Sequence, residues 1–214
     1  ERSRGLGDVY KRQDKTIQKA LEKNISLQQY TYPYTQAFFE DLDTLQIQRA
    51  EAYPRATHFI PQMLAMIEKL ISQDKAYRRD GNVFFNLRKF PAYGRLSHLN
   101  MSDLKTGASG RTDRDEYSKE SVSDFVLWKA YNQTRDGNIF WESPFGPGRP
   151  GWHIECSAMA HALLGTSIDM HMGGVDNIFP HHENEIAQSE SCFKTQFVRC
   201  LLYTSDAADE RSSV

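Results

Sequence analysis

Three side chains in the last third of the chain have the types and spacing of a metal site. His181 and Glu185 are four residues apart, so on a helix they project from one face and can bind the same ion. Cys156 offers a thiolate, a soft ligand that favours zinc over magnesium or calcium. Three protein ligands and one exchangeable position are typical of a catalytic or substrate-binding zinc. The spacing alone also allows a core cysteine and an ordinary surface pair.

Two neighbouring features could line a small-ligand pocket. Gly173 and Gly174 follow a predicted strand at residues 168–172, and a glycine turn at the end of a parallel strand lets a ligand approach the backbone closely. Asp176 could then accept hydrogen bonds from ribose hydroxyls. Trp152 could form a wall of such a pocket. The alternatives are an ordinary tight turn and a tryptophan that fills the core.

Amphipathic segments predict the helices that must position these side chains. Apolar residues recur at helical spacing in three segments before residue 75 and in two after residue 150. The expected helices cover residues 16–27, 33–45, 60–71, 154–164 and 182–191. In the second of them, we expect a buried apolar stripe formed by Phe38, Phe39, Leu42 and Leu45.

Shorter apolar runs predict strands. Alternation around Asp80 and Gly81 indicates a β-hairpin, and residues 125–129 and 168–172 each predict one strand. The charged run at 106–123 predicts a solvated loop, and residues 143–151, with three prolines and three glycines, predict a tight loop. Strands that alternate with helices indicate an α/β fold with a parallel sheet.

The composition excludes several classes of protein. The chain has 214 residues, and 26 basic against 28 acidic side chains give a net charge of −2, so no overall charge favours nucleic acid, although a local basic patch would be compatible with it. No apolar run approaches the roughly 20 residues of a membrane span, and no signal peptide is visible. Three widely spaced cysteines do not form a disulfide framework. These features predict a soluble cytoplasmic protein.

The two ends of the chain are related through the DNA sequences that could encode them. The segments DVYKRQ at residues 8–13 and CLLYTS at residues 200–205 can be encoded by complementary strands, shifted by one base. Such an inverted repeat resembles the ends of a transposon-based sequencing-library adapter that has been translated. We therefore expect residues 1–13 and 200–214 to be adapter-derived and residues 14–199 to be authentic.

Two longer motifs resemble those of one family. GRPGWHIECSAM at residues 148–159 resembles the segment around a zinc ligand of cysteinyl-tRNA synthetases, and FPHHENEIAQ at 179–188 resembles the segment that holds two more ligands. FVLWK at 125–129 and YPRAT at 53–57 are also similar. The resemblance covers residues 14–199. It implies a partial class I synthetase domain, an α/β Rossmann-type parallel sheet that is incomplete at both ends, with a connective subdomain inserted at about residues 77–145.

The resemblance also implies an activity. Those enzymes activate L-cysteine with ATP, accompanied by Mg²⁺, and pass the cysteine to tRNA(Cys). A bound Zn²⁺ takes the substrate thiolate as a ligand, which separates cysteine from serine more strongly than shape alone can. The implied roles are zinc binding by Cys156, His181 and Glu185, amino-acid binding by Trp152 and His171, and ATP binding at the ribose by Gly174 and Asp176. We expect a monomer with no membrane partner.

Two other functions compete with this interpretation. The cysteine ligase of mycothiol synthesis shares the fold, the zinc site and the adenylation chemistry, but it typically lacks the carboxylate at the position of Glu185. The intact HHENE motif at residues 181–185 therefore favours the synthetase. A non-catalytic protein with a structural zinc is the second alternative, and its closed site should not respond to cysteine.

We expect this polypeptide by itself not to form cysteinyl adenylate. The family's first zinc-ligand cysteine and its His-x-Gly-His motif precede the residues that resemble it, and the Lys-Met-Ser-Lys-Ser loop and the anticodon-binding region follow residue 199. Met172 stands where the family often has a further glycine. Adenylate formation depends on groups that position and stabilise the phosphates, and no catalytic residue is assigned in this chain. Cysteine-dependent ATP–pyrophosphate exchange by the chain would contradict this expectation.

Overall fold

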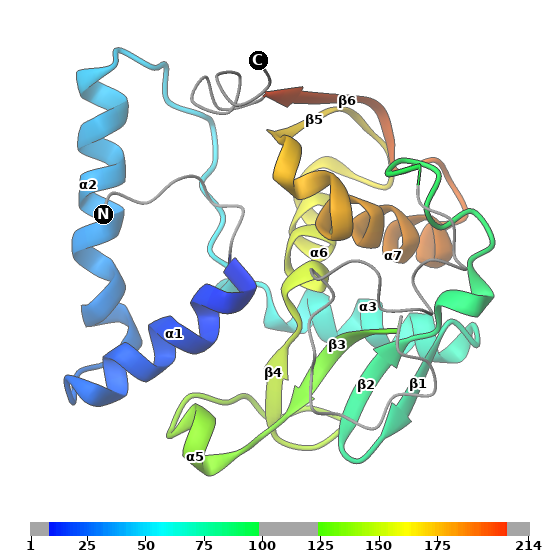
Figure 1. The fold of residues 1–214 in the computed structure, drawn as a ribbon, viewed down its shortest axis with the longest axis horizontal. Helices are drawn as coiled ribbons and strands as arrows, with labels where there is room; N and C mark the ends of the chain where they lie inside the picture. The colour runs from blue at the N-terminus through cyan, green and yellow to red at the C-terminus, as the bar shows by residue number, and fades with distance from the viewer. Residues whose placement is uncertain (1–8, 99–123, 205–214) are drawn as a thin grey trace, which may run out of the picture.

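The computed structural model describes residues 9–98 and 124–204 (Figure 1). An N-terminal pair of helices lies beside a body in which two sheets and three longer helices pack together. The charged loop predicted at residues 106–123 lies outside the described ranges. Within those ranges, no helix combines the length and the apolar character needed to cross a bilayer.

The N-terminal helices are α1 (Val9–Glu22) and α2 (Leu27–Thr44). Helix α2 begins earlier than the predicted residue 33, because Ser26 and Gln29 form a capping box. The Gln29 N–H donates to Ser26 Oγ at 3.1 Å, and the Ser26 N–H donates to Gln29 Oε1 at 2.9 Å. These bonds satisfy backbone donors that a helix start otherwise leaves unpaired.

The prediction of a buried stripe on α2 is wrong. No residue of α2 is buried, Phe38 is 40 % exposed, and Leu45 after the helix is 68 % exposed. Helix α2 stands apart from the body and packs mainly on α1 (Figure 1). Its aromatic side chains instead pack locally, with Phe39 edge-on to Tyr53 at 5.0 Å between ring centroids. Helical periodicity thus identified the apolar face but not what covers it.

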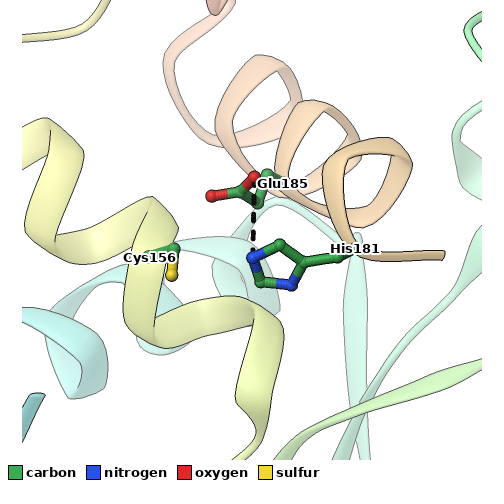
Figure 2. A group of neighbouring side chains, drawn as sticks. All are labelled: Cys156, His181 and Glu185. Atoms are coloured by element: carbon green, nitrogen blue, oxygen red, sulfur yellow. Dashed lines mark ion pairs between the residues drawn. The ribbon is translucent and has the colours of Figure 1, made fainter. Parts of the chain in front are cut away.

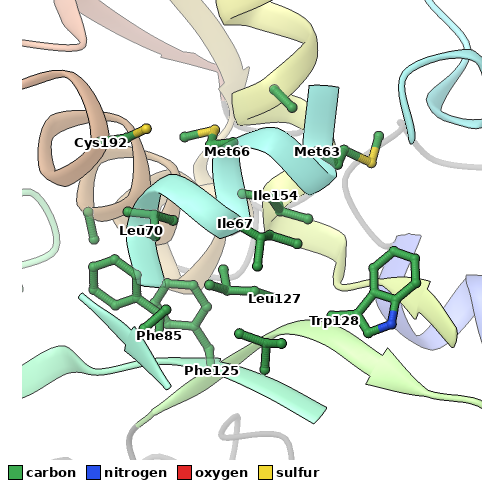
Figure 3. Packing of buried hydrophobic residues seen from close by; sticks show 14 of the residues in the cluster. Met63, Met66, Ile67, Leu70, Phe85, Phe125, Leu127, Trp128, Ile154 and Cys192 are labelled. Atoms are coloured by element: carbon green, nitrogen blue, oxygen red, sulfur yellow. The ribbon is translucent and has the colours of Figure 1, made fainter. Parts of the chain in front are cut away.

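Helix α3 (Ile60–Ser72) carries the main core. The helical periodicity predicted over residues 60–71 is confirmed, because Ile60, Met63, Ile67 and Leu70 are buried and Leu64 and Ile71 are half-buried against them. Met66 is also buried in this core. Figure 3 shows these side chains between the strands of the larger sheet and the two C-terminal helices.

The larger sheet is antiparallel, in the order β1-β2-β3-β4. Its strands are β1 (Ala76–Arg79), β2 (Asn82–Phe85), β3 (Phe125–Ala130) and β4 (Gly148–Pro150). The predicted hairpin is confirmed between β1 and β2. Asp80 and Gly81 have φ values of 51° and 75°, as the common two-residue hairpin turn requires.

The loop predicted at residues 143–151 is wrong in its last part, where β4 pairs with β3. Proline and glycine indicated a loop, but an edge strand also tolerates them. Gly148 is needed there, since a Cβ atom would lie 2.1 Å from the carbonyl oxygen of Lys129. The short helix α5 (Gln133–Asp136) lies in the connection between the two strands.

The C-terminal part of the chain contains a pair of parallel strands, which confirms the predicted α/β class. Its elements are α6 (Trp152–Leu164), β5 (Ile168–Gly174), α7 (Glu183–Phe193) and β6 (Val198–Thr204). Strands β5 and β6 pair in parallel, with α7 between them in the chain. Residues 200–204, which we expect to be adapter-derived, pair with β5 through backbone groups. Every residue except proline can supply these groups in full, so the pairing does not depend on their side chains.

The glycine turn predicted after residue 172 is wrong in position. Strand β5 continues through both glycines, and a 3-10 turn follows at Val175–Asn177. A short irregular turn at Ile178–His182 then leads into α7. Further short 3-10 turns lie at Ala56–His58 and Leu87–Lys89.

Candidate metal centre

The structure brings the three predicted ligands together (Figure 2). Cys156 comes from the second turn of α6, His181 from the turn before α7, and Glu185 from the first turn of α7. Their donor atoms all lie within 4.8 Å of one another, and His181 Nε2 is 3.8 Å from Glu185 Oε2. The packing of α6 against α7 therefore converts two distant sequence motifs into one cluster.

The cluster fits Zn²⁺ by its donor chemistry. A thiol, an imidazole and a carboxylate are the usual zinc donors, and metal–ligand distances of 2.0–2.3 Å place tetrahedral donors about 3.5 Å apart. Glu185 is only 1 % exposed and His181 is buried, whereas Cys156 is half-buried. Cys156 is thus the least buried of the three candidate ligands.

Protonation in the cluster follows from burial and from Glu185. Burial, followed by the charges of Glu185 and Glu155, raises the pKa of the Cys156 thiol well above its ordinary value. Binding of a metal to this sulfur must therefore displace a proton. Burial alone would raise the pKa of Glu185, but a hydrogen bond from His171 and the nearby histidines lower it, so this carboxylate is ionised at neutral pH.

The ring of His181 is held on two sides. Trp152 stacks on it with ring centroids 4.2 Å apart and an interplanar angle of 17°. On its edge, His181 Nδ1 lies 3.0 Å from His153 Nδ1. Burial lowers the pKa of His181 despite the opposing charge of Glu185, and burial with the neighbouring His181 lowers that of His153 well below its ordinary value. Both rings are therefore neutral at pH 7, as metal binding requires of His181.

The two residues predicted for the amino-acid pocket adjoin this cluster. Trp152 covers His181, and His171 Nε2 lies 2.8 Å from Glu185 Oε2. Burial alone would lower the pKa of His171, but its hydrogen bond to Glu185 and the carboxylate charge raise it. His171 therefore donates to Glu185 and holds one face of the carboxylate in place.

His182 is a member of the cluster that our sequence reasoning missed. With His171 and Glu185 it forms a second group of donors within 4.8 Å of one another. Burial is the main reason that its pKa falls to about 4, so the ring is neutral at pH 7. Its position beside His181 in the HHENE motif was the available signal.

The predicted ribose-binding residues lie together at the end of β5. Asp176 is exposed, and a Cβ atom at Gly174 would lie 2.4 Å from its Oδ1. At Gly173, a Cβ atom would lie 2.7 Å from Cε1 of His182. A side chain at Gly173 would therefore collide with the buried ring of His182, whereas the exposed carboxylate of Asp176 could rotate away from one at Gly174.

Two further residues of the HHENE motif fix the start of α7. The buried carboxylate of Glu183 accepts hydrogen bonds from the N–H of Gly94 at 2.7 Å and from the N–H and Oγ of Ser97, both at 2.9 Å. Asn184 accepts one from the Tyr93 hydroxyl at 2.5 Å. Because these partners lie some 90 positions away, no local sequence signal could have revealed them.

Comparison with protein families decides the identity of the domain. The model of the tRNA synthetase class I (C) catalytic domain matches residues 6–208. The chain belongs to this family. The match confirms the expected synthetase fold, and the adapter origin expected for residues 1–13 and 200–214 stays a prediction.

The curated relatives of this family member are cysteine–tRNA ligases. The proteins from Chlamydia pneumoniae and Protochlamydia amoebophila are 62 % and 59 % identical to it over 90 % and 89 % of the chain. The protein from Chlamydia trachomatis serovar D is 56 % identical over 94 % of it. The chain spans 40 % to 42 % of the length of these relatives.

Proposed function

We propose that the chain is the central part of the catalytic domain of a cysteine–tRNA ligase. The complete enzyme activates L-cysteine with ATP and Mg²⁺ and transfers it to tRNA(Cys). The observation that carries this proposal is the cluster of Cys156, His181 and Glu185, which adjoins Trp152 and His171. A cysteine-specific ligase needs such a thiolate-selecting site, and the named relatives have that activity.

The proposed zinc ligands are Cys156, His181 and Glu185. When bound there, zinc supplies a soft Lewis acid that favours a thiolate over a hydroxyl. Cys156 and Glu185 each contribute a negative charge, and the neutral His181 contributes none. Trp152 shields the face of His181, and His171 orients Glu185 by its hydrogen bond.

We place the adenosine ribose at Gly174 and Asp176. The exposed carboxylate of Asp176 can accept hydrogen bonds from two hydroxyl groups. The absence of a side chain at Gly174 leaves this carboxylate beside the backbone of β5, where the family fold binds nucleotides at the ends of parallel strands.

A binding experiment on the 214-residue chain tests the metal site. Equilibrium dialysis is expected to give one Zn²⁺ per chain, and calorimetry is expected to show L-cysteine binding only after zinc has been loaded. L-Serine should not compete, because its hydroxyl is a poor ligand at neutral pH. Zinc binding with no response to cysteine would instead indicate a structural metal site.

We also propose that residues 14–199 are the authentic part of the chain and that the connective subdomain covers about residues 77–145. The antiparallel hairpin of β1 and β2 with its partner β3, within residues 76–130, supports a subdomain distinct from the parallel pair β5–β6. Strand β4 (Gly148–Pro150) extends the same sheet just beyond residue 145. The DNA sequence of the parent gene tests the first of these proposals. A gene that encodes CLLYTS after residue 199 without an adapter junction would contradict it.

A further inference from the structure

We propose that His153 is a positioning residue for the metal site. Its Nδ1 accepts a hydrogen bond from the Nδ1–H of His181, which fixes the tautomer of His181 that presents an unprotonated Nε2 to Cys156 and Glu185. This inference rests on the proposed zinc site, because a positioning residue needs a metal ligand to position. The hydrogen bond itself can be tested without metal.

The roles of the two rings follow from geometry. The two Nδ1 atoms are 3.0 Å apart, so one ring must donate and the other must accept. The other nitrogen of His181, Nε2, faces Glu185 at 3.8 Å. A neutral histidine that binds metal through Nε2 carries its proton on Nδ1. His181 is therefore the donor, and His153 is the acceptor with its own proton on Nε2.

The position of His153 in α6 makes this contact specific. It lies three residues before Cys156, so the same turn of helix supplies a ligand and the partner of another ligand. Its ring is buried and lies edge-on to Phe125, with centroids 5.6 Å apart and an interplanar angle of 80°. Trp152 stacks on His181 and also contacts His153, with ring centroids 4.2 Å and 4.8 Å apart, so both imidazoles pack against aromatic rings.

A neutral acceptor also suits the charge of the cluster. Metal-binding histidines usually donate their second N–H to a carboxylate, a backbone carbonyl or water. With zinc bound, the thiolate of Cys156 and the carboxylate of Glu185 would already supply two negative charges against the two positive charges of Zn²⁺. Another carboxylate in this buried place would add an uncompensated charge, which is costly to bury, whereas the imidazole of His153 orients His181 without one.

Nitrogen NMR of the metal-free chain tests the hydrogen bond directly. With ¹⁵N-labelled histidine, His181 is expected to carry its proton on Nδ1 in the wild type. In the His153→Leu variant Nδ1 has lost its acceptor, so the proton is expected on Nε2, beside Glu185. His153→Asn should restore the wild-type tautomer, because asparagine Oδ1 can occupy the position of Nδ1. A wild-type proton on Nε2 would overturn the inference.

Zinc affinity, measured by competition with a chromogenic chelator, provides the second readout. We expect His153→Leu to weaken Zn²⁺ binding by about 10- to 100-fold, the usual loss for a residue that orients a ligand, and His153→Asn to recover most of it. The matched control is His161→Leu on the same helix, where the ring stacks on Phe193 at 3.8 Å; its zinc affinity should stay at the wild-type value.

The outcomes separate the two proposals. If the wild-type chain binds Zn²⁺ and His153→Leu binds it equally well, His153 has no positioning role. If the wild-type chain binds no Zn²⁺, the proposed metal site fails, and the tautomer of His181 still decides which ring donates the hydrogen bond. Thermal unfolding of each variant distinguishes loss of orientation from loss of fold.

Discussion

Replacing Cys156 with serine is expected to lower the Zn²⁺ affinity of the chain by roughly 60- to 700-fold. Structural zinc sites with four ligands bind with about 10–16 kcal/mol, so an average ligand contributes about 2.5–4 kcal/mol, and each 1.4 kcal/mol is a factor of ten. Serine keeps the size of the side chain but replaces the sulfur by a hydroxyl that stays protonated at neutral pH. Chelator competition at pH 7 measures the change.

The other two cysteines provide controls for this substitution. Cys200 is exposed and Cys192 is buried in the main core, and neither belongs to the donor clusters found among the described residues. Cys200→Ser should leave both affinity and stability unchanged. Cys192→Ser should lower stability, because it buries a hydroxyl among apolar side chains, and should leave affinity unchanged. Equal zinc affinity in wild type and Cys156→Ser would refute the assignment of this ligand.

Replacing Asp136 with asparagine is expected to lower the free energy of unfolding by about 3–5 kcal/mol, the typical cost of removing one partner of a buried ion pair. Asp136 is fully buried. Its carboxylate lies 3.0 Å from Nε of the buried Arg149 and 2.6 Å from Nη2 of Arg135, and it accepts the N–H of Asn132 at 2.9 Å. Urea unfolding at pH 7 measures the loss.

The pH dependence of this loss has a defined sign. Burial alone would raise the pKa of Asp136, but the hydrogen bonds from Arg135 and Asn132 and the charge of Arg149 lower it. Its contribution to stability is therefore complete above the unfolded value of about 3.9 and is lost as pH falls through the lower folded value. The difference between wild type and Asp136→Asn should be constant from about pH 5 to 7 and should shrink below about pH 4.

An exposed aspartate serves as the matched control. Asp169 pairs with Arg199 at 3.1 Å, and both side chains are exposed. Asp169→Asn should cost less than about 1 kcal/mol, since water screens such pairs. A loss at Asp136 no larger than at Asp169 would mean that the buried pair contributes nothing beyond a surface one.

The sequence predicted those elements whose signal is local. The apolar face of α3 and the turn at Asp80 and Gly81 followed from periodicity and from backbone preference, and both are confirmed. The burial of α2 could not be predicted, because periodicity does not say whether another element covers a face. Strand β4 was missed because pairing with β3 can override the loop preference of glycine and proline.

The residues of the candidate site also divide into those that a local sequence signal predicts and those that only tertiary packing brings together. Cys156, His181 and Glu185 could be nominated from residue chemistry and from a four-residue spacing, and the structure places them together. The partners that orient them could not be found so easily. His153 contacts a residue 28 positions away, and Glu183 contacts the segment around Gly94 some 90 positions away. Such contacts depend on how the helices and strands pack against one another, which the sequence pattern does not predict.

The hydrogen bonds of Glu183 have a consequence for the order of folding. They close a loop of 86 to 89 residues between the segment at Gly94 and Ser97 and the first turn of α7, two residues before Glu185. Contacts of such high sequence separation carry a large closure entropy and form slowly. We therefore expect the helical turn that carries Glu185 to reach its final position late in folding, when the segment after β2 has docked. Ion affinity at this site should then appear after the local helices and the hairpin have formed.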